Sequence, residues 1–201
     1  IGALDGYNGE TDALDYADMP ALEKWALHRL SELDALVRCA IADHDYKRIF
    51  SALFNFCTVD LSAFYFDIRK DALYCDPLES DRRRACRTVM DAIFVRLTTW
   101  LAPILSFTCE EVWQTRFPTD DGSVHLELFR DTPEQWVNAG LATHMATVRA
   151  FRASVSESIE PARAAGDIRS SLEASVTAPT DDALVKALGA LSISRQEIYP
   201  D

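Results

Sequence analysis

The chain is poor both in residues that break helices and in cations. Its 201 residues include only 7 glycines and 8 prolines, while 48% of them are hydrophobic, which excludes a collagen-like or globally disordered chain. Lysine and arginine number 20 against 32 acidic residues, so the net charge is −12. Because such a chain repels phosphate as a whole, the composition disfavours non-specific nucleic-acid binding, and no DNA partner is predicted. Any nucleic-acid contact is expected at a local basic patch.

Several kinds of site and segment are also missing. The five cysteines form no CxxC pair, which indicates reduced, mostly buried thiols in a cytoplasmic protein and predicts no metal site. No stretch has the eighteen or so uncharged apolar residues of a membrane span, so no membrane partner is expected. The motifs of serine hydrolases, zinc proteases, P-loop NTPases and dinucleotide-binding folds are absent as well. The sequence therefore predicts no catalytic residue.

Apolar residues recur at helical spacing through most of the chain. This periodicity predicts long helices over residues 20–42, 45–66, 81–101 and 141–166, the second of them capped by Asp45 and the last ending at Gly166. Phe50 and Phe54 widen the apolar stripe of the second helix, so we expect it to be buried on more than one side. A polar turn is expected over residues 69–78, and a capping box at Thr108 is expected to restart a helix.

The pattern changes near the end of the chain. Residues 172–177 alternate apolar and polar side chains, which predicts a strand, and a short helix is expected from residue 181 or 182 to about 188. The fold class predicted is mainly α: an antiparallel bundle of four to five helices with a small partial α/β appendage at the C-terminus. We expect a linker over 1–18, the bundle over 19–166 and a truncated subdomain over 167–201, with both ends cut from a longer chain.

One segment is locally basic. Between Arg69 and Arg96 there are seven cations and five acidic residues, a local charge of +2 in an acidic chain. Arg83 and Arg87 lie one helical turn apart, so they are expected to present guanidinium groups on one face, suited to phosphates or unpaired bases. An alternative is a solvated face whose arginines pair with nearby carboxylates. The candidate RNA-binding residues in this segment are Arg69, Lys70, Tyr74, Arg82, Arg83 and Arg87.

Other polar side chains in this part of the chain are given structural roles. Asp60, Tyr65 and Asp67 fall at helical spacing beside core aromatic residues. A polar group buried in a helical bundle needs a hydrogen-bond partner. We therefore expect these three side chains to hold the bundle together, and only Tyr74 is a candidate stacking ring for an RNA base.

A set of motifs in fixed order resembles bacterial isoleucyl-tRNA synthetases, which are class I aminoacyl-tRNA synthetases. The most specific is Asp60-Leu-Ser-Ala-Phe-Tyr-Phe-Asp67, preceded by Phe54-Asn-Phe-Cys57. The others are Trp25-Ala-Leu-His-Arg-Leu30, Trp100-Leu-Ala-Pro-Ile-Leu105, Phe107-Thr-Cys-Glu-Glu-Val-Trp113, Ser123-Val-His-Leu-Glu127 and Ile168-Arg-Ser-Ser-Leu-Glu-Ala174. Together they cover nearly the whole chain.

This resemblance implies the helical anticodon-binding domain of such an enzyme, which grips the anticodon arm of isoleucine tRNA and works with the rest of the synthetase chain. Neither ATP-binding signature of the family, His-Ile-Gly-His-like or Lys-Met-Ser-Lys-Ser-like, occurs in the chain. The fragment alone is thus expected to be non-catalytic and without cofactor. The resemblance assigns ATP, Mg²⁺ and a structural zinc to other parts of the parent enzyme.

Two other interpretations are open. The same helical domain occurs in the relatives that charge valine, leucine or methionine, which share the Trp-Leu-Ala-Pro stretch. An acidic helical scaffold that binds another protein would also fit the charge and the apolar surface of a bundle. Salt dependence separates this scaffold from an RNA-binding module, because RNA binding weakens steeply as salt is added.

Overall fold

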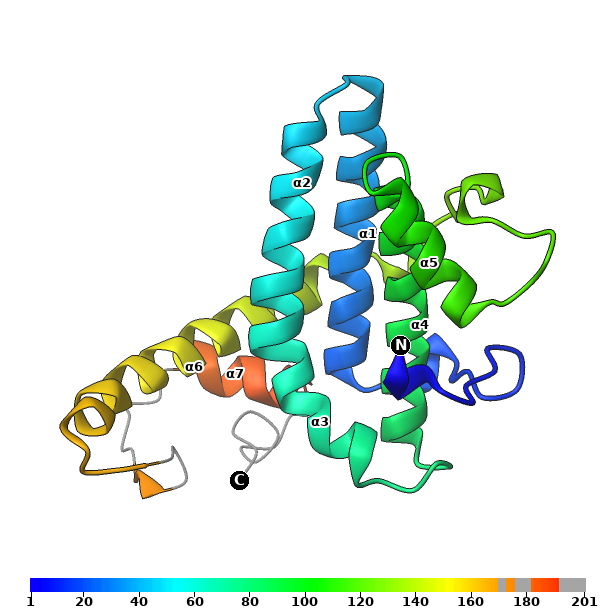
Figure 1. Ribbon diagram of the computed structural model, residues 1–201. Helices are drawn as coiled ribbons and strands as arrows, with labels where there is room; N and C mark the ends of the chain where they lie inside the picture. The colour runs from blue at the N-terminus through cyan, green and yellow to red at the C-terminus, as the bar shows by residue number, and fades with distance from the viewer. Residues whose placement is uncertain (170–172, 176–181, 192–201) are drawn as a thin grey trace. The chain divides into compact units, whose positions relative to one another are not determined.

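The computed structural model describes residues 1–169, 173–175 and 182–191 (Figure 1). Most of these residues are helical and none of them forms a strand, in agreement with the mainly α fold predicted. The chain divides into two compact units, residues Ile1–Val137 and Asn138–Asp201. The predicted boundary between bundle and appendage was residue 166, so the structure divides the chain nearly thirty residues earlier.

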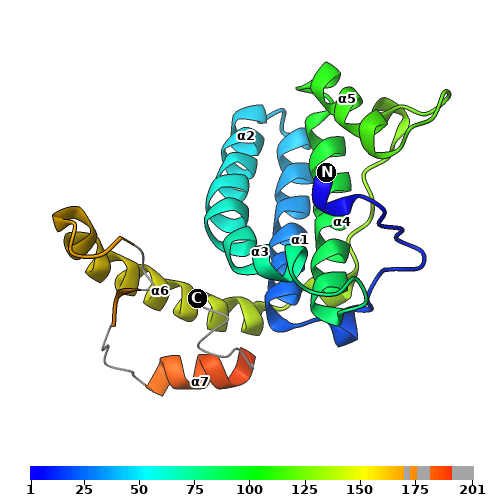
Figure 2. The same ribbon diagram turned by 60° about the horizontal axis from the view of Figure 1, so that its bottom comes forward.

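The first unit is an antiparallel bundle. Helix α1 (Ala21–Ala42) is followed by one continuous helical stretch made of α2 (Tyr46–Asn55), the π-helical η3 (Phe56–Phe66) and α3 (Asp67–Tyr74). Helices α4 (Asp81–Leu101) and α5 (Ser106–Arg116) complete it, with short 3-10 turns at Gly2–Leu4, Tyr16–Asp18, Val124–Leu126 and Glu134–Trp136. Figures 1 and 2 show α1 between α2 and α4, and α1 contacts both helices.

Two clusters of apolar side chains hold this unit together. In the first, the Trp25 ring of α1 meets Phe64 edge to face with ring centroids 5.3 Å apart. In the second, Trp113 of α5 lies 4.8 Å from the ring of Phe117 and packs with Val95 of α4. Aromatic pairs in these geometries add to the free energy gained from burial. Trp25 and Trp113 are both buried in these clusters.

The buried polar residues predicted to be structural behave as expected in two cases. The carboxylate of Asp60 is buried, and its Oδ2 accepts a hydrogen bond from Arg29 Nε at 3.2 Å. Tyr65 is fully buried, with its hydroxyl 3.3 Å from Glu23 Oε1. Asp67 is half-buried and pairs with Lys70 at the surface.

Four local predictions are wrong. The turn expected from Arg69 is helical as far as Tyr74, because Ala72 and Leu73 are buried and extend the apolar face. Phe50 and Phe54 are exposed, since they point away from the buried side of α2. The side chain of Thr108 caps nothing, because α5 begins two residues earlier. Finally, most of the cysteines were predicted to be buried, but only Cys86 and Cys109 of the five are.

The predicted helix cap at Asp45 is confirmed, because its side chain accepts a hydrogen bond from the Arg48 amide at 3.0 Å.

The N-terminal segment is more than the expected linker. Leu4 and Tyr7 are buried, and the Tyr7 hydroxyl donates to Thr88 Oγ1 of α4 at 3.2 Å. The segment therefore packs on α4 as part of the first unit.

The second unit is built on α6 (Ala139–Ala165), which contacts α7 (Asp182–Leu191). The Asn138 side chain caps α6 by accepting from the Leu141 amide at 3.0 Å. The helix continues through Pro161 and ends, as predicted, at Gly166, whose φ of 80° suits the residue without a Cβ. Of the strand expected over 172–177, residues 173–175 are described and form no strand, while its other residues lie outside the described part.

One helix among the described residues is long and apolar enough to cross a membrane by length and composition. It is the continuous stretch Tyr46–Tyr74, with a mean hydropathy of 1.4 over its most apolar window. Within the bundle this stretch packs on α1 and α4, and its buried Asp60 and Arg69 each form an ion pair with a residue of α1. These contacts are those of a core helix in a bundle.

Candidate functional site

The predicted basic segment spans α3, the loop of residues 75–80 and the first half of α4. The structure shows what each guanidinium group of this segment contacts. Lys70 and Tyr74 lie on α3, and Arg82, Arg83 and Arg87 lie on the first two turns of α4. Their separate environments decide which of them can meet a ligand.

Arg69 is buried and bound inside the bundle. Its Nε and Nη2 atoms donate to the two carboxylate oxygens of Glu23 at 2.6 and 2.8 Å, a bidentate pair with α1. Burial alone would lower the pKa of Arg69, but the charge and hydrogen bonds of Glu23 outweigh it and raise the pKa well above its ordinary value. With 3% of its surface exposed, Arg69 joins α1 and α3 through this structural ion pair. Its burial does not favour the predicted RNA contact.

Burial next to the same pair also affects two neighbours. Desolvation raises the pKa of the Cys86 thiol to about 12, and it raises that of the Tyr65 hydroxyl as well. Both groups are therefore neutral at physiological pH, and Cys86 has none of the thiolate character that a nucleophile needs.

Arg82 and Arg83 close the loop before α4. Arg82 donates from Nε and Nη2 to the Asp76 carboxylate at 2.8 and 2.7 Å, and Arg83 Nη1 donates to the Asp76 carbonyl oxygen at 2.6 Å. Hydrogen bonding from Arg82 lowers the pKa of the Asp76 carboxyl. The structure thus brings two candidates, Arg82 and Arg83, together around Asp76. The carboxylate of Asp76 neutralises part of their positive charge.

Arg87 holds the N-terminal segment against α4. It is buried, with Nε and Nη2 donating to the carbonyl oxygens of Ala3 and Asp5 at 3.1 and 2.5 Å. Its guanidinium carbon lies 5.2 Å from the centre of the Tyr7 ring. The outward face expected from Arg83 and Arg87 does not form, because residues 1–7 cover Arg87. These contacts are structural, and an RNA contact by Arg87 stays a prediction.

Lys70 and Tyr74 are the candidates most open to solvent. The Lys70 ammonium lies 3.7 Å from Asp67 Oδ1 in an exposed pair, and Tyr74 exposes 74% of its surface on the last turn of α3. An exposed pair of this kind contributes little and opens easily. Together with the outer edge of Arg82, they are what remains of the predicted surface.

A second group of cations, absent from the six predicted candidates, lies at the start of α2. Lys47 and Arg48 on the first turn of α2 are exposed, and among the described residues neither of them forms an ion pair. Phe50 and Phe54, assigned to the core, are exposed one and two turns further along. The signal was available, because residues 46–59 contain two cations and no acidic residue.

No group of three or more His, Cys, Asp or Glu side chains in the described part of the chain could hold a metal ion.

Comparison with known proteins identifies the family. Residues 23–178 match the family described as the anticodon-binding domain of tRNA ligase. Isoleucine–tRNA ligase of Gluconobacter oxydans is 51% identical over 179 residues, which cover 89% of this chain and 18% of that protein. The corresponding proteins of Ruegeria pomeroyi and Zymomonas mobilis are 50% and 46% identical, over 94% and 96% of this chain and 19% and 21% of their own lengths.

The chain spans about a fifth of the length of these curated relatives. The family match begins in the first turn of α1 and includes the other helices of the bundle and α6. The chain belongs to the family of anticodon-binding domains of tRNA ligases.

Proposed function

We propose that the chain binds the anticodon arm of isoleucine tRNA and positions it for ATP-dependent aminoacylation by a catalytic domain outside this chain. The observation that carries this proposal is the identity of about one half to isoleucine–tRNA ligases along nearly the whole chain. The names of these relatives support isoleucine over the valine, leucine and methionine alternatives. The protein is proposed to act in the cytoplasm, as part of the synthetase.

The bundle offers physical support for this role. A rigid wall of helices fixes the position of an RNA stem, and local cations on an acidic body attract phosphate at one place while carboxylates repel it elsewhere. Lys70, Tyr74, Lys47 and Arg48 are exposed for such contacts. The chain itself supplies no catalytic group or cofactor in this proposal; ATP, Mg²⁺ and the structural zinc belong to the parent enzyme.

A binding titration tests the proposal. The chain is titrated with an isoleucine tRNA transcript and with the same transcript carrying an altered anticodon, each at low and moderate salt. We expect binding that weakens as salt is added, with a preference for the unaltered anticodon. Equal, salt-sensitive binding to both transcripts would restrict the role to positioning the arm. Absence of binding at low salt would refute the proposal.

One observation favours the protein scaffold as a second candidate. Phe107 on the first turn of α5 is 93% exposed, and Leu126 and Leu128 beside the turn at Val124–Leu126 are also exposed. Side chains of this kind commonly contact another protein surface. An apolar protein interface would respond little to salt, so the titration above distinguishes the two candidates.

A further inference from the structure

We propose that the outer face of α2, made by Lys47, Arg48, Phe50 and Phe54, is a stacking surface for unpaired RNA bases. This inference rests on the proposed function and names the part of the tRNA that the face would take, the single-stranded loop. None of the six candidates from the sequence belongs to it.

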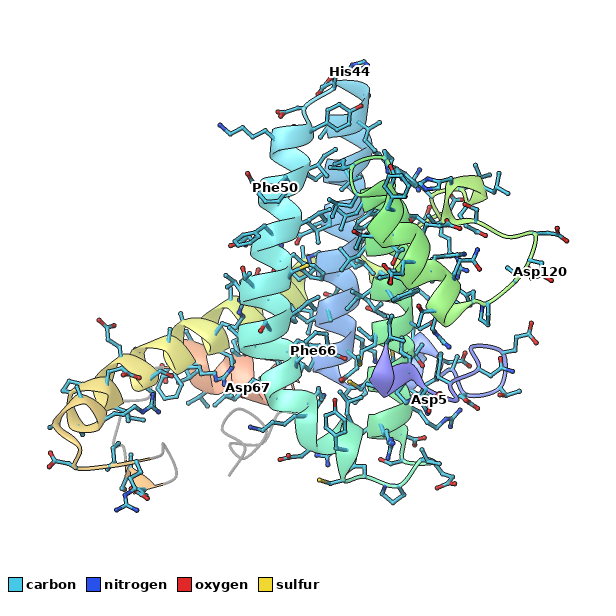
Figure 3. The ribbon with its side chains drawn as sticks, in the orientation of Figure 1. Asp5, His44, Phe50, Phe66, Asp67 and Asp120 are labelled. Atoms are coloured by element: carbon cyan, nitrogen blue, oxygen red, sulfur yellow. The ribbon has the colours of Figure 1, made fainter. Side chains whose placement is uncertain are left out.

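Phe50 and Phe54 form an exposed aromatic surface on which a base could stack. They lie four residues apart on α2, so their side chains follow one another along one face of the helix. Their rings are stacked, with centroids 5.8 Å apart and planes 26° from parallel. Phe50 and Phe54 nevertheless expose 61% and 59% of their surface. Figure 3 shows Phe50 on the outer side of α2.

The buried side of α2 explains why these rings stay outside. Ile49 and Leu53 are buried and alternate with the phenylalanines around the helix, and α2 contacts α1. The bundle already has its apolar stripe in this helix. Two exposed aromatic rings on the opposite side add no core packing, so they need another explanation than stability.

Charge identifies the class of partner. Lys47 is three residues before Phe50 and seven before Phe54, which places all three on one face. Arg48 is adjacent on the exposed side. Since residues 46–59 carry no carboxylate, the rings stand next to cations and away from anions. Cations that hold a phosphate backbone beside rings that stack on bases are the two elements of single-strand recognition.

The nearest carboxylates reduce the positive charge of Lys47 and Arg48 but do not cancel it. Asp43 and Asp45 occupy the turn between α1 and α2, next to His44 at the end of the bundle (Figure 3). Asp45 is engaged as the helix cap, accepting from the Arg48 amide. Stacking therefore supplies most of the expected affinity, and the two cations supply its salt dependence.

Phe107 gives a matched comparison within the same chain. It is more exposed than either phenylalanine of α2, but Glu110 and Glu111 follow it within α5 and there is no cation within four residues in sequence. If exposure alone made a base-binding ring, Phe107 would serve equally well. The inference predicts that it does not.

The test uses two RNAs. The first is a hairpin with the sequence of an isoleucine tRNA anticodon arm, carrying 2-aminopurine at one loop position. The second is a duplex of the same stem without a loop. The intact chain, Phe50→Ser/Phe54→Ser and Phe107→Ser are titrated with both. Circular dichroism and the urea midpoint verify that each variant is folded, as expected for exposed residues with similar helix propensity.

We expect the chain to prefer the hairpin and to quench the 2-aminopurine fluorescence. The double variant should lose about tenfold or more in hairpin affinity and the quenching, because two stacking rings are gone. Its affinity for the duplex should not change, and Phe107→Ser should behave like the unmodified chain. As a second variant that leaves the rings in place, Lys47→Gln/Arg48→Gln should lower the slope of log affinity against log salt by about 1.4.

The outcomes separate this inference from the proposed function. If the double variant binds and quenches the hairpin as the unmodified chain does, the stacking face is refuted while tRNA binding stands. If it keeps hairpin affinity but no longer associates with the remaining domains of the synthetase, the face is a protein interface and the inference is equally refuted. If the unmodified chain binds neither RNA, both proposals fail.

Discussion

The arginines between residues 69 and 87 and the cations at the start of α2 carry the same charge but differ in what they contact. Arg69 and Arg87 are buried against Glu23 and against backbone carbonyls, and Arg82 is held by Asp76. Lys47 and Arg48 are exposed and, within the described residues, form no ion pair. The denser basic segment therefore stabilises the fold, while the sparser one is available to a ligand. Local charge in a sequence does not measure the charge that a partner can reach.

The most severe test of this comparison removes the buried guanidinium. Arg69→Met leaves the fully buried Glu23 carboxylate without its partner, and we expect a loss of roughly 3–5 kcal/mol in the free energy of unfolding. Urea denaturation measures it. Lys70→Met, the adjacent exposed cation, is the matched control and should change stability by less than about 0.5 kcal/mol. Similar effects from the two variants would mean that the Glu23 pair does not hold the helices.

A second variant tests whether Arg87 contacts RNA or holds the N-terminal segment. Arg87→Gln loses hydrogen bonds to two backbone carbonyls and the contact with the Tyr7 ring, so we expect about 2 kcal/mol less stability. Limited proteolysis should show faster cleavage within residues 1–18. Hairpin affinity of the folded variant should not change. Weaker RNA binding at full stability would restore Arg87 as an RNA contact.

The helices themselves were accessible to sequence reasoning. Regular apolar spacing located α1 and α4, and the capping residue Asp45 marked the start of α2, because both signals act over a few residues. The burial of Arg69 was not accessible. It depends on Glu23, 46 residues away, and no local pattern reports a partner at that distance.

The prediction that Phe50 and Phe54 are buried was wrong for a different reason. Each of them directly follows a buried residue of α2, Ile49 or Leu53. Adjacent helix residues point about 100° apart, so an apolar stripe widened to include Phe50 and Phe54 reaches the exposed side of the helix. The family resemblance located the domain correctly, but it contained no information on which cations are paired.

Asp76 holds the guanidinium group of Arg82 at the surface. Asp76→Asn removes the carboxylate that Arg82 holds, so this region should become more like the start of α2. We expect hairpin affinity to rise about threefold, the effect of roughly one surface charge. Asp71→Asn removes the same charge from α3, where no ion pair to Asp71 is formed among described residues, and serves as the control. An equal gain in both variants would show a general field effect without a role for Arg82.

The smallest effect expected is the pH dependence of the Asp76 pair. Its hydrogen bonds with Arg82 lower the pKa of the Asp76 carboxyl. The pair therefore stabilises the fold above the ordinary aspartate pKa of about 4, and this contribution is lost as pH falls through the lower value of the folded state. Because Arg82 is nearly half exposed, the contribution should stay below about 1 kcal/mol.

Urea unfolding of the unmodified chain and of Asp76→Asn, measured at a series of pH values, isolates this contribution. The difference between the two should be constant from neutral pH down to about pH 4 and should then shrink toward zero, because a protonated aspartic acid and asparagine are both neutral. A difference that grew in acid would mean that Asp76 stabilises the loop as a neutral acceptor. In that case Arg82 would be less restrained than its geometry indicates, and the contrast with α2 would weaken.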